Sequence, residues 1–249
     1  MLFQTLHYAI FLILVIGMYW SSPYRYRLHI IGVASIVFYG SWNVHYVPLL
    51  VGVAILAWGL GRLFSQSRRP DAPQWQFALA LSTLFIPLGI FKYWDWVVET
   101  ITAVLAWTGI SVELPRRADY NIILPVGISF FTFQAASYLV DVRRNGEEED
   151  NPWRFISFLA FFPQLIAGPI VRQHELLPQL KKPLLLERND LGEALFRITK
   201  GLVKKLVFAD LLYHSIIEQT FADPMTYRGI ELWVALYAYT IWIYYDFSA

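Results

Sequence analysis

The stretch LHIIGVASIVFYGSWNVHYVPLLVGVAILAWGLG, residues 28–61, decides the fold because it contains no Asp, Glu, Lys or Arg. About 20 apolar residues in a helix cross the hydrocarbon core of a bilayer, so this run approaches the length of two crossings. Residues 43–46 stand near its middle and provide a short uncharged link. We therefore predict helical crossings over residues 28–42 and 47–64.

The composition of the whole chain supports the same class of protein. Hydrophobic residues make up 57% of the 249 positions and charged residues 16%, whereas globular domains carry roughly 25% charged residues. Further charge-free runs cover residues 1–24, 74–91, 120–140, 155–171 and 232–245. These features predict an all-α, polytopic transmembrane protein, with residues 1–249 in one membrane domain.

Basic residues predict the orientation of the crossings. The first apolar run has no basic leader and no small-residue cleavage site, so we expect a retained helix rather than a signal peptide. Arginines follow the first run and later runs, and the positive-inside rule places them in the cytoplasm, which puts the amino terminus outside. The arginines in question are Arg25, Arg27, Arg68, Arg69, Arg143 and Arg144.

The middle of the chain allows two interpretations. Residues 78–107 form either one long helix bent at Pro87, which we favour, or two elements divided near residues 92–95, because an internal proline removes a backbone hydrogen bond. Residues 109–119 form a polar link, and residues 120–141 cross back. The acidic run at residues 147–150 reads as a solvated loop.

Two later segments differ from simple crossings. The run from Phe155 is short and is interrupted by Pro163, Gly168 and Pro169. Irregular backbone survives at membrane depth only where protein or water covers it, so we expect a re-entrant element. Residues 189–210 carry leucines and an isoleucine at helical spacing and basic residues on another face, which predicts an interfacial amphipathic helix. Its basic residues are Arg197, Lys200, Lys204 and Lys205.

Several kinds of site are excluded or disfavoured. The chain has no cysteine, so it contains no thiolate metal ligand, disulfide or cysteine nucleophile. Gly52, Gly59 and Gly61 lie in an apolar helix and favour close packing or bending over nucleotide binding. The histidines have no metal-ligand spacing, and we expect interfacial or packing roles for them and no metal site. They are His7, His29, His45, His174 and His214.

Five segments, in this order, carry a family resemblance. They are PVGISFFTFQAASYLVD (125–141), FFPQLIAGPIVR (161–172), LLPQL (176–180), GLVKKLVFAD (201–210) and IYYDFS (243–248), with a weaker match at FKY (91–93). Together they closely resemble the membrane-bound O-acyltransferase family, in the bacterial branch of alginate O-acetyltransferase and the D-alanyl transfer protein of teichoic acid modification.

The resemblance implies a function. Such enzymes pass an acyl group from a cytoplasmic thioester, acetyl-CoA or an acyl carrier, toward an extracytoplasmic acceptor such as alginate. It also implies a bacterial inner-membrane location, contact with lipid, an extracytoplasmic acetyltransferase partner, no bound cofactor and no nucleic acid.

The resemblance also implies where the catalytic histidine belongs. The branch places it in a Trp-His pair beyond the Asp-Phe-Ser motif, and this sequence has no Trp-His pair. We therefore expect no catalytic residue within this chain, and we expect the histidine to lie downstream of Ala249. The chain would then be an amino-terminal portion, truncated at its carboxyl end, that is inactive alone.

Candidate cavity residues lie in the matched segments. Gln134, Tyr138 and Asp141 share one helical face, and each is either cavity-lining or a structural residue. Arg172 offers charge-assisted bonds to donor phosphates or to lipid phosphates. Gln164 and Pro169 share its broken element, and Asp246 is a candidate buried acid that orients the catalytic segment or a helix-end residue.

An O-acetyltransferase is the function we favour from the sequence. A transporter is one alternative, because broken helices and intramembrane polar groups also mark transport paths. A noncatalytic, truncated scaffold is the other.

Overall fold

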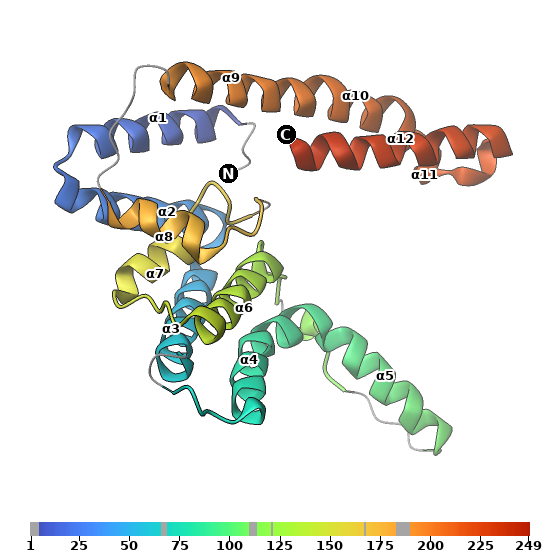
Figure 1. Ribbon diagram of the computed structural model, residues 1–249. Helices are drawn as coiled ribbons and strands as arrows, with labels where there is room; N and C mark the ends of the chain where they lie inside the picture. Colours follow the sequence, from blue (N-terminus) through green and yellow to red (C-terminus); the bar gives the residue numbers. More distant parts are fainter. Residues whose placement is uncertain (1–4, 66–68, 110–113, 121, 167, 183–189) are drawn as a thin grey trace. The chain divides into compact units, whose positions relative to one another are not determined.

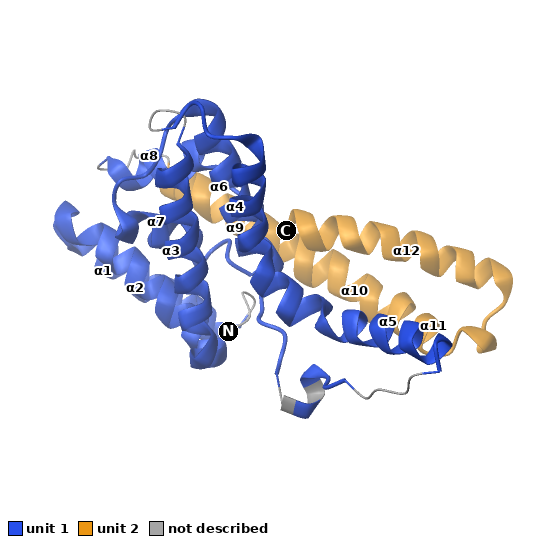
Figure 2. Ribbon diagram, turned by 90° about the horizontal axis from the view of Figure 1, so that it is seen from below, with its two compact units in different colours: residues 1–183 blue, residues 184–249 orange. Residues whose placement is uncertain are grey.

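The computed structural model describes residues 5–65, 69–109, 114–120, 122–166, 168–182 and 190–249 (Figure 1). Every regular element among these residues is a helix. The chain divides into two compact units, residues 1–183 and 184–249, coloured blue and orange in Figure 2.

Unit 1 begins with helices that match the predicted crossings. Helix α1 (Leu6–Ser21) starts at Thr5, whose side chain accepts a hydrogen bond from the Tyr8 backbone, and α2 (Tyr24–Asn43) follows after Pro23. A 3₁₀ turn, η1 (Val44–Tyr46), leads into α3 (Val47–Phe64). The predicted helices at 28–42 and 47–64 are confirmed.

Two helical stretches among the described residues have the length and apolar composition to cross a membrane. They are Tyr24–Phe64, with a mean hydropathy of 1.9, and Gln74–Trp107, with 1.5. Helix α1 is apolar but shorter. The sequence predicts more membrane crossings than these two stretches, and that larger number stays a prediction.

The second long stretch is one bent helix. Helix α4 (Gln74–Leu88) contains Pro87 and continues through a wider π-helical turn, η2 (Gly89–Tyr93), into α5 (Trp94–Trp107). A proline lacks the N–H of the normal helical bond and its ring crowds the carbonyl four residues earlier, so the helix bends there. Figure 1 shows α4 and α5 running in different directions, which confirms the bent-helix interpretation.

Helix α6 (Ile128–Asn145) starts later than predicted. The expectation of a crossing from residue 120 is wrong for residues 122–127, because Pro125 restricts the chain and Gly127 has a φ of 77°. The non-helical backbone is tied down by hydroxyl groups: Tyr39 donates to the Val126 carbonyl at 3.1 Å and Tyr46 to the Ile123 carbonyl at 2.7 Å. These bonds satisfy carbonyls that a helix would have paired internally. A short 3₁₀ turn, η3 (Arg117–Tyr120), precedes this stretch.

Helix α3 packs against α6 and α7 (Pro152–Leu159) to form the core of unit 1. Gly61 makes the contact with α6 possible, because a Cβ there would lie 2.5 Å from the Tyr138 ring. Gly52 and Gly59 have no such neighbour within 4 Å. The packing role predicted for the three glycines therefore holds for Gly61.

The loops after α3 and α6 lie together. Arg143 donates to the carbonyls of Arg69 at 2.8 Å and Ala72 at 2.9 Å. Arg69 and Arg143 therefore lie side by side in unit 1, and the cytoplasmic side predicted for them stays a prediction. Arg68 lies outside the described residues.

The predicted broken element is irregular in the structure. Described residues between α7 and α8 (Gln173–Lys181) form turns rather than a helix. The Phe162 N–H donates to Ser35 of α2 at 3.2 Å, and Gly127 touches the Leu165 carbonyl so closely that a Cβ would stand 2.5 Å from it. The element is therefore anchored inside unit 1, and its re-entrant position in a membrane stays a prediction.

Unit 2 is a helical hairpin. A long helical arm joins α9 (Asp190–Val203), η4 (Lys204–Ala209), α10 (Asp210–Leu212), η5 (Tyr213–Ile217) and α11 (Glu218–Ala222). After a 3₁₀ turn, η6 (Pro224–Thr226), helix α12 (Gly229–Ser248) returns along this arm (Figure 1). The stretches η4 and η5 are π-helical, a wider form that occurs frequently at functional sites.

Candidate functional site

The predicted polar residues of α6 are buried in unit 1. Gln134, Tyr138 and Asp141 are 4%, 1% and 5% exposed. Their spacing of three to four positions places them on one face of the helix. Burial of a polar group costs free energy unless the group forms a hydrogen bond. The hydrogen-bond partners of these three side chains therefore indicate whether each has a structural role.

Asp141 is paired with the broken element. Its Oδ1 accepts a hydrogen bond from Nη1 of Arg172 at 2.9 Å. The other oxygen of Asp141 is buried and has no partner among the described residues. The Arg172 side chain is 54% exposed, and a guanidinium has five N–H donors, so the pair leaves donors for another ligand.

Tyr138 has structural contacts. Its hydroxyl accepts the Glu149 backbone N–H at 3.2 Å, and its ring lies 4.4 Å from the ring of Phe155. The same ring covers Gly61. These contacts hold α3, α6 and α7 together.

Gln134, Gln164 and Pro169 do not join the Asp141–Arg172 pair in the described structure. Gln164 donates to the Phe158 carbonyl at the end of α7, at 3.3 Å. Pro169 is exposed. The amide nitrogen of Gln134 is buried without a hydrogen-bond partner in the described part of unit 1.

Other buried polar atoms in unit 1 also lack partners among the described residues. They include the hydroxyl of Thr132 on α6, both side-chain polar atoms of Gln173 on α8, and the Nε1 of Trp153 and Nε of Arg154 on α7. Native buried polar groups are nearly always hydrogen-bonded, so each such group marks a place for water or a ligand. The sequence analysis did not single out Thr132 or Gln173.

Glu149 is a buried acid that the sequence reasoning missed. The interpretation of residues 147–150 as a solvated loop is wrong for Glu149, whose side chain is 1% exposed. Its Oε1 accepts from Arg154 at 2.7 Å, and its Oε2 lies 3.0 Å from the ammonium of Lys181. Trp58 donates to its backbone carbonyl at 2.7 Å. Two cations and an indole from separate helices therefore converge on one residue.

The Asn151-Pro152 pair is the local sequence feature near Glu149 that indicates ordered structure. Asn151 caps α7 by accepting from the backbones of Trp153 and Arg154, and Pro152 suits the first turn of a helix. That signal predicts an ordered helix start, and so a less mobile acidic run. It says nothing of the distant partners Trp58 and Lys181.

Unit 2 contains a separate ionic cluster. Lys205 of η4 pairs with Asp246 of α12, and with Asp210 at 3.1 Å. Partial burial lowers the pKa of the Lys205 ammonium, but hydrogen bonds and charge from Asp246 and Asp210 outweigh this and raise the pKa above 10.5. The sequence suggested a buried acid at Asp246. Its side chain is partly exposed within unit 2, and it forms the ion pair with Lys205.

The last residues of α12 pack against the arm beside this cluster. Lys204 donates to the backbone and side chain of Ser248, each at 3.1 Å. A Cβ added at Gly201 would stand 2.6 Å from the carbonyl oxygen of Ala249. Both contacts join α12 to the arm. The catalytic histidine expected downstream of Ala249 would lie outside this sequence, so that expectation stays a prediction.

The remaining predicted basic residues lie on the same arm. Arg197 pairs with Glu193 one turn earlier. Lys200 is exposed, as are the leucines of α9, within unit 2 taken by itself. An exposed apolar face beside basic residues fits the predicted amphipathic helix, and its position at a membrane interface stays a prediction.

All five histidines are exposed on their own units. His214 pairs with Glu218 at 2.8 Å, His45 contacts Asn43 at 3.1 Å, and His29 stacks on Trp153. None is enclosed with the buried polar groups of α6. Among the described residues no cluster of three His, Cys, Asp or Glu has the arrangement to hold a metal ion.

Comparisons with known proteins give clear relatives. The chain is 34% identical to a probable alginate O-acetylase of Azotobacter vinelandii over 96% of its own length and 47% of the relative. It is 30% identical to a peptidoglycan O-acetyltransferase of Helicobacter pylori, over 94% of this chain and 48% of that protein. A teichoic acid D-alanyltransferase of Lacticaseibacillus rhamnosus is 24% identical over 49% of the chain and 33% of the relative.

The chain thus spans about half the length of its alginate and peptidoglycan relatives. No family model matches the sequence, and no solved structure matches it.

Proposed function

The chain belongs to the membrane-bound O-acyltransferase family, and from this membership we propose that it takes part in moving an acetyl group from a thioester donor to a hydroxyl group of an extracytoplasmic polysaccharide. Similarity over 96% of the chain to a probable alginate O-acetylase is the observation that carries the proposal. The peptidoglycan O-acetyltransferase supports the same type of acceptor, a sugar hydroxyl. Alginate is the acceptor we favour.

The reaction requires a base and a positioned thioester. A base removes the proton of the acceptor hydroxyl, the oxygen attacks the thioester carbonyl, and the thiol leaves with a proton. A histidine suits this role because its unperturbed pKa is about 6.5. All five histidines here are exposed on their units, which supports a catalytic base supplied from outside residues 1–249.

Within this proposal, the buried polar residues of unit 1 line the route of the acyl group. The unpartnered amide of Gln134 and the free donors of Arg172 are groups that polar parts of a donor would satisfy. The donor is acetyl-CoA or an acetylated carrier on the cytoplasmic side. An extracytoplasmic acetyltransferase partner and surrounding lipid complete the proposed assembly.

We further propose a multi-pass location in the bacterial inner membrane, supported by the two long apolar helices. Single cysteines introduced at residues 25 and 144 test it cleanly, because the chain has no other cysteine. Impermeant thiol reagents should label neither position in intact cells and both after the membrane is opened. Labelling in intact cells would contradict the orientation.

The activity test compares two purified forms with labelled acetyl donor and alginate. Residues 1–249 alone should transfer no acetyl, and a form extended to the length of the relatives should transfer it. In the extended form, Gln134→Ala should reduce transfer and the exposed control Gln219→Ala should leave it unchanged. Turnover by residues 1–249 that vanishes in His174→Ala would move the catalytic base into this chain. An extended form without turnover would favour a scaffold.

A further inference from the structure

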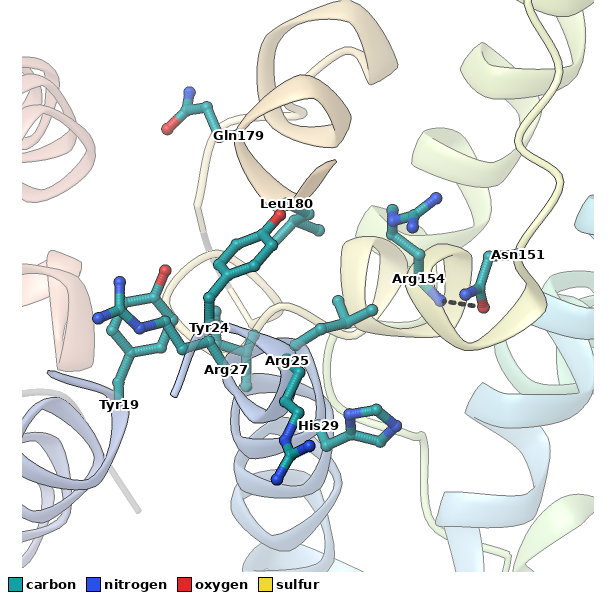
Figure 3. A pocket seen from close by; sticks show the side chains of 11 residues that line it. Tyr19, Tyr24, Arg25, Arg27, His29, Asn151, Arg154, Gln179 and Leu180 are labelled. Carbon is teal, nitrogen blue, oxygen red and sulfur yellow. Dashed lines mark hydrogen bonds between the residues drawn. The ribbon is translucent and has the colours of Figure 1, made fainter. Parts of the chain in front are cut away.

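A cavity of about 240 Å³ lies in unit 1, away from the Asp141–Arg172 pair (Figure 3). The end of α1, the start of α2, the start of α7 and the end of α8 surround it. Its lining includes Tyr19, Tyr24, Arg25, Arg27, His29 and Arg154. Tyr24 closes one side by donating to the Lys181 carbonyl at 2.6 Å.

The lining of the cavity is positively charged and contains no Asp or Glu. Neither Arg25 nor Arg27 forms an ion pair with a carboxylate in the part of the chain that the structure describes. Arg154 does pair with Glu149, but Lys181 pairs with the same acid. The charge of Glu149 is therefore already matched, and Arg25 and Arg27 remain uncompensated.

The guanidinium group of Arg27 is held in position by its neighbours. Arg27 donates to the Ser22 carbonyl at 3.3 Å, and its guanidinium lies 5.1 Å from the ring of Tyr19 and 4.7 Å from that of Trp20. Figure 3 shows Arg27 beside Tyr19. Such stacking fixes the plane of a guanidinium and limits the entropy lost when it binds.

Arg154 adds an unused donor. Its Nε is buried and has no hydrogen-bond acceptor among the described residues. A buried donor without a partner is costly, and Arg154 already uses Nη1 to pair with Glu149. The cavity therefore offers two cations, Arg25 and Arg27, that lack carboxylate partners among the described residues.

We propose that this cavity binds the phosphate group of an anionic ligand. Planar guanidinium groups match phosphate oxygens through paired hydrogen bonds, more specifically than a lysine does. A phospholipid headgroup is the source we favour, because Tyr19, Trp20 and Tyr24 stand where two apolar helices end, and Trp and Tyr gather at membrane interfaces. The phosphate of a soluble compound is the other source of the same chemistry.

The test measures binding to the full 249-residue chain in neutral detergent by native mass spectrometry. The probes are dioctanoyl phosphatidylglycerol, dioctanoylglycerol, which lacks the phosphate, and inorganic phosphate. Arg25→Gln with Arg27→Gln removes two cavity charges, and Arg116→Gln with Arg144→Gln removes two exposed charges elsewhere in unit 1. Unchanged elution and thermal unfolding show which variants fold.

We expect one tightly bound phosphatidylglycerol per chain, with affinity about tenfold or more weaker in the cavity variant, and no change in the control variant. Dioctanoylglycerol should not bind at this site. Displacement of the lipid by millimolar inorganic phosphate, with comparable phosphate affinity, would assign the site to a soluble phosphate. If the variant with Arg25→Gln and Arg27→Gln does not fold, the single variant Arg27→Gln provides the test. Its affinity for phosphatidylglycerol should be about fivefold weaker than that of the wild-type chain. Equal binding by the folded cavity variant and the wild-type chain would overturn the proposal.

Discussion

The ring of Tyr138 lies against Gly61 so closely that a Cβ added at residue 61 would stand 2.5 Å from ring carbon Cε1 and 2.8 Å from the hydroxyl oxygen. This contact joins the last turn of α3 to the second half of α6. Tyr138 is 1% exposed, and Phe155 packs against its ring, so the ring has no room to move away.

Gly61→Ala should therefore destabilise the protein by about 1–3 kcal/mol, the usual cost of an overpacked core. Thermal unfolding in detergent measures this as a lower midpoint. Gly59→Ala is the matched control, because nothing lies within 4 Å of its added Cβ. Alanine is the better helix former, so the control should be neutral or slightly more stable. Equal loss in both variants would show that the Tyr138 contact is not the cause.

Glu149→Gln should destabilise unit 1 by about 1–3 kcal/mol, because it removes the charge that holds two cations and leaves their donors poorly paired. Its side chain is 1% exposed, so water does not replace the lost interaction easily. Denaturant unfolding of the two forms gives the difference. Glu147→Gln removes the same charge from an exposed neighbour and should shift stability by less than about 0.5 kcal/mol.

Asp141 and Arg172 should show a coupling free energy of about 1 kcal/mol. The estimate is modest because the Arg172 side chain is 54% exposed, and exposure screens an ion pair. A double-mutant cycle with Asp141→Asn and Arg172→Gln isolates the pairwise contribution. Strictly additive losses in the cycle would show that the two side chains do not stabilise each other.

Lys205 should give unit 2 a pH-dependent stability at alkaline pH. Its folded-state pKa is raised above 10.5, so the folded state binds the proton more tightly than the unfolded state does. The stabilisation is complete below pH 10.5 and is lost as the pH rises through the folded-state pKa. The difference in unfolding free energy between the wild-type chain and Lys205→Gln should be constant at neutral pH. It should shrink as the pH rises above 10.5.

The basic face of the unit 2 arm should bind anionic lipid. A peptide of residues 189–210 in which Arg197, Lys200 and Lys204 are replaced by Gln should bind phosphatidylglycerol vesicles less tightly, by up to about 1 kcal/mol per charge. Arg197 should contribute least, because Glu193 already pairs with it. Vesicles of neutral phosphatidylcholine provide the control. Equal partitioning of both peptides into anionic vesicles would rule out the interfacial assignment.

Much of the helical organisation follows from the sequence because it depends on local information. A charge-free run with a short link in its middle sufficed to predict α2 and α3, and Pro87 sufficed to predict the bend between α4 and α5. The start of α6 was missed although Pro125 and Gly127 stand at its beginning. The apolar run continues through both residues, so its hydrophobic length predicts a longer helix than the turn residues allow.

The candidate site was less predictable because its contacts are distant in the chain. Helical spacing correctly placed Gln134, Tyr138 and Asp141 on one buried face. Spacing does not reveal that Arg172 pairs with Asp141, nor that Glu149 is buried. An acidic residue in a polar run is usually solvated, and only tertiary structure shows where its partners come from.

The partners of Glu149 also set an order of events during synthesis. Trp58 and Tyr138 leave the ribosome before Glu149, whereas Arg154 and Lys181 follow it. At roughly 5–20 residues per second, Lys181 is added seconds after Glu149. Until then Glu149 can pair with Arg154 but not with Lys181. A chain that ends before α8 therefore contains Arg154 but not Lys181, so Glu149 Oε1 has its partner while Oε2 lacks the ammonium that it contacts in the complete unit.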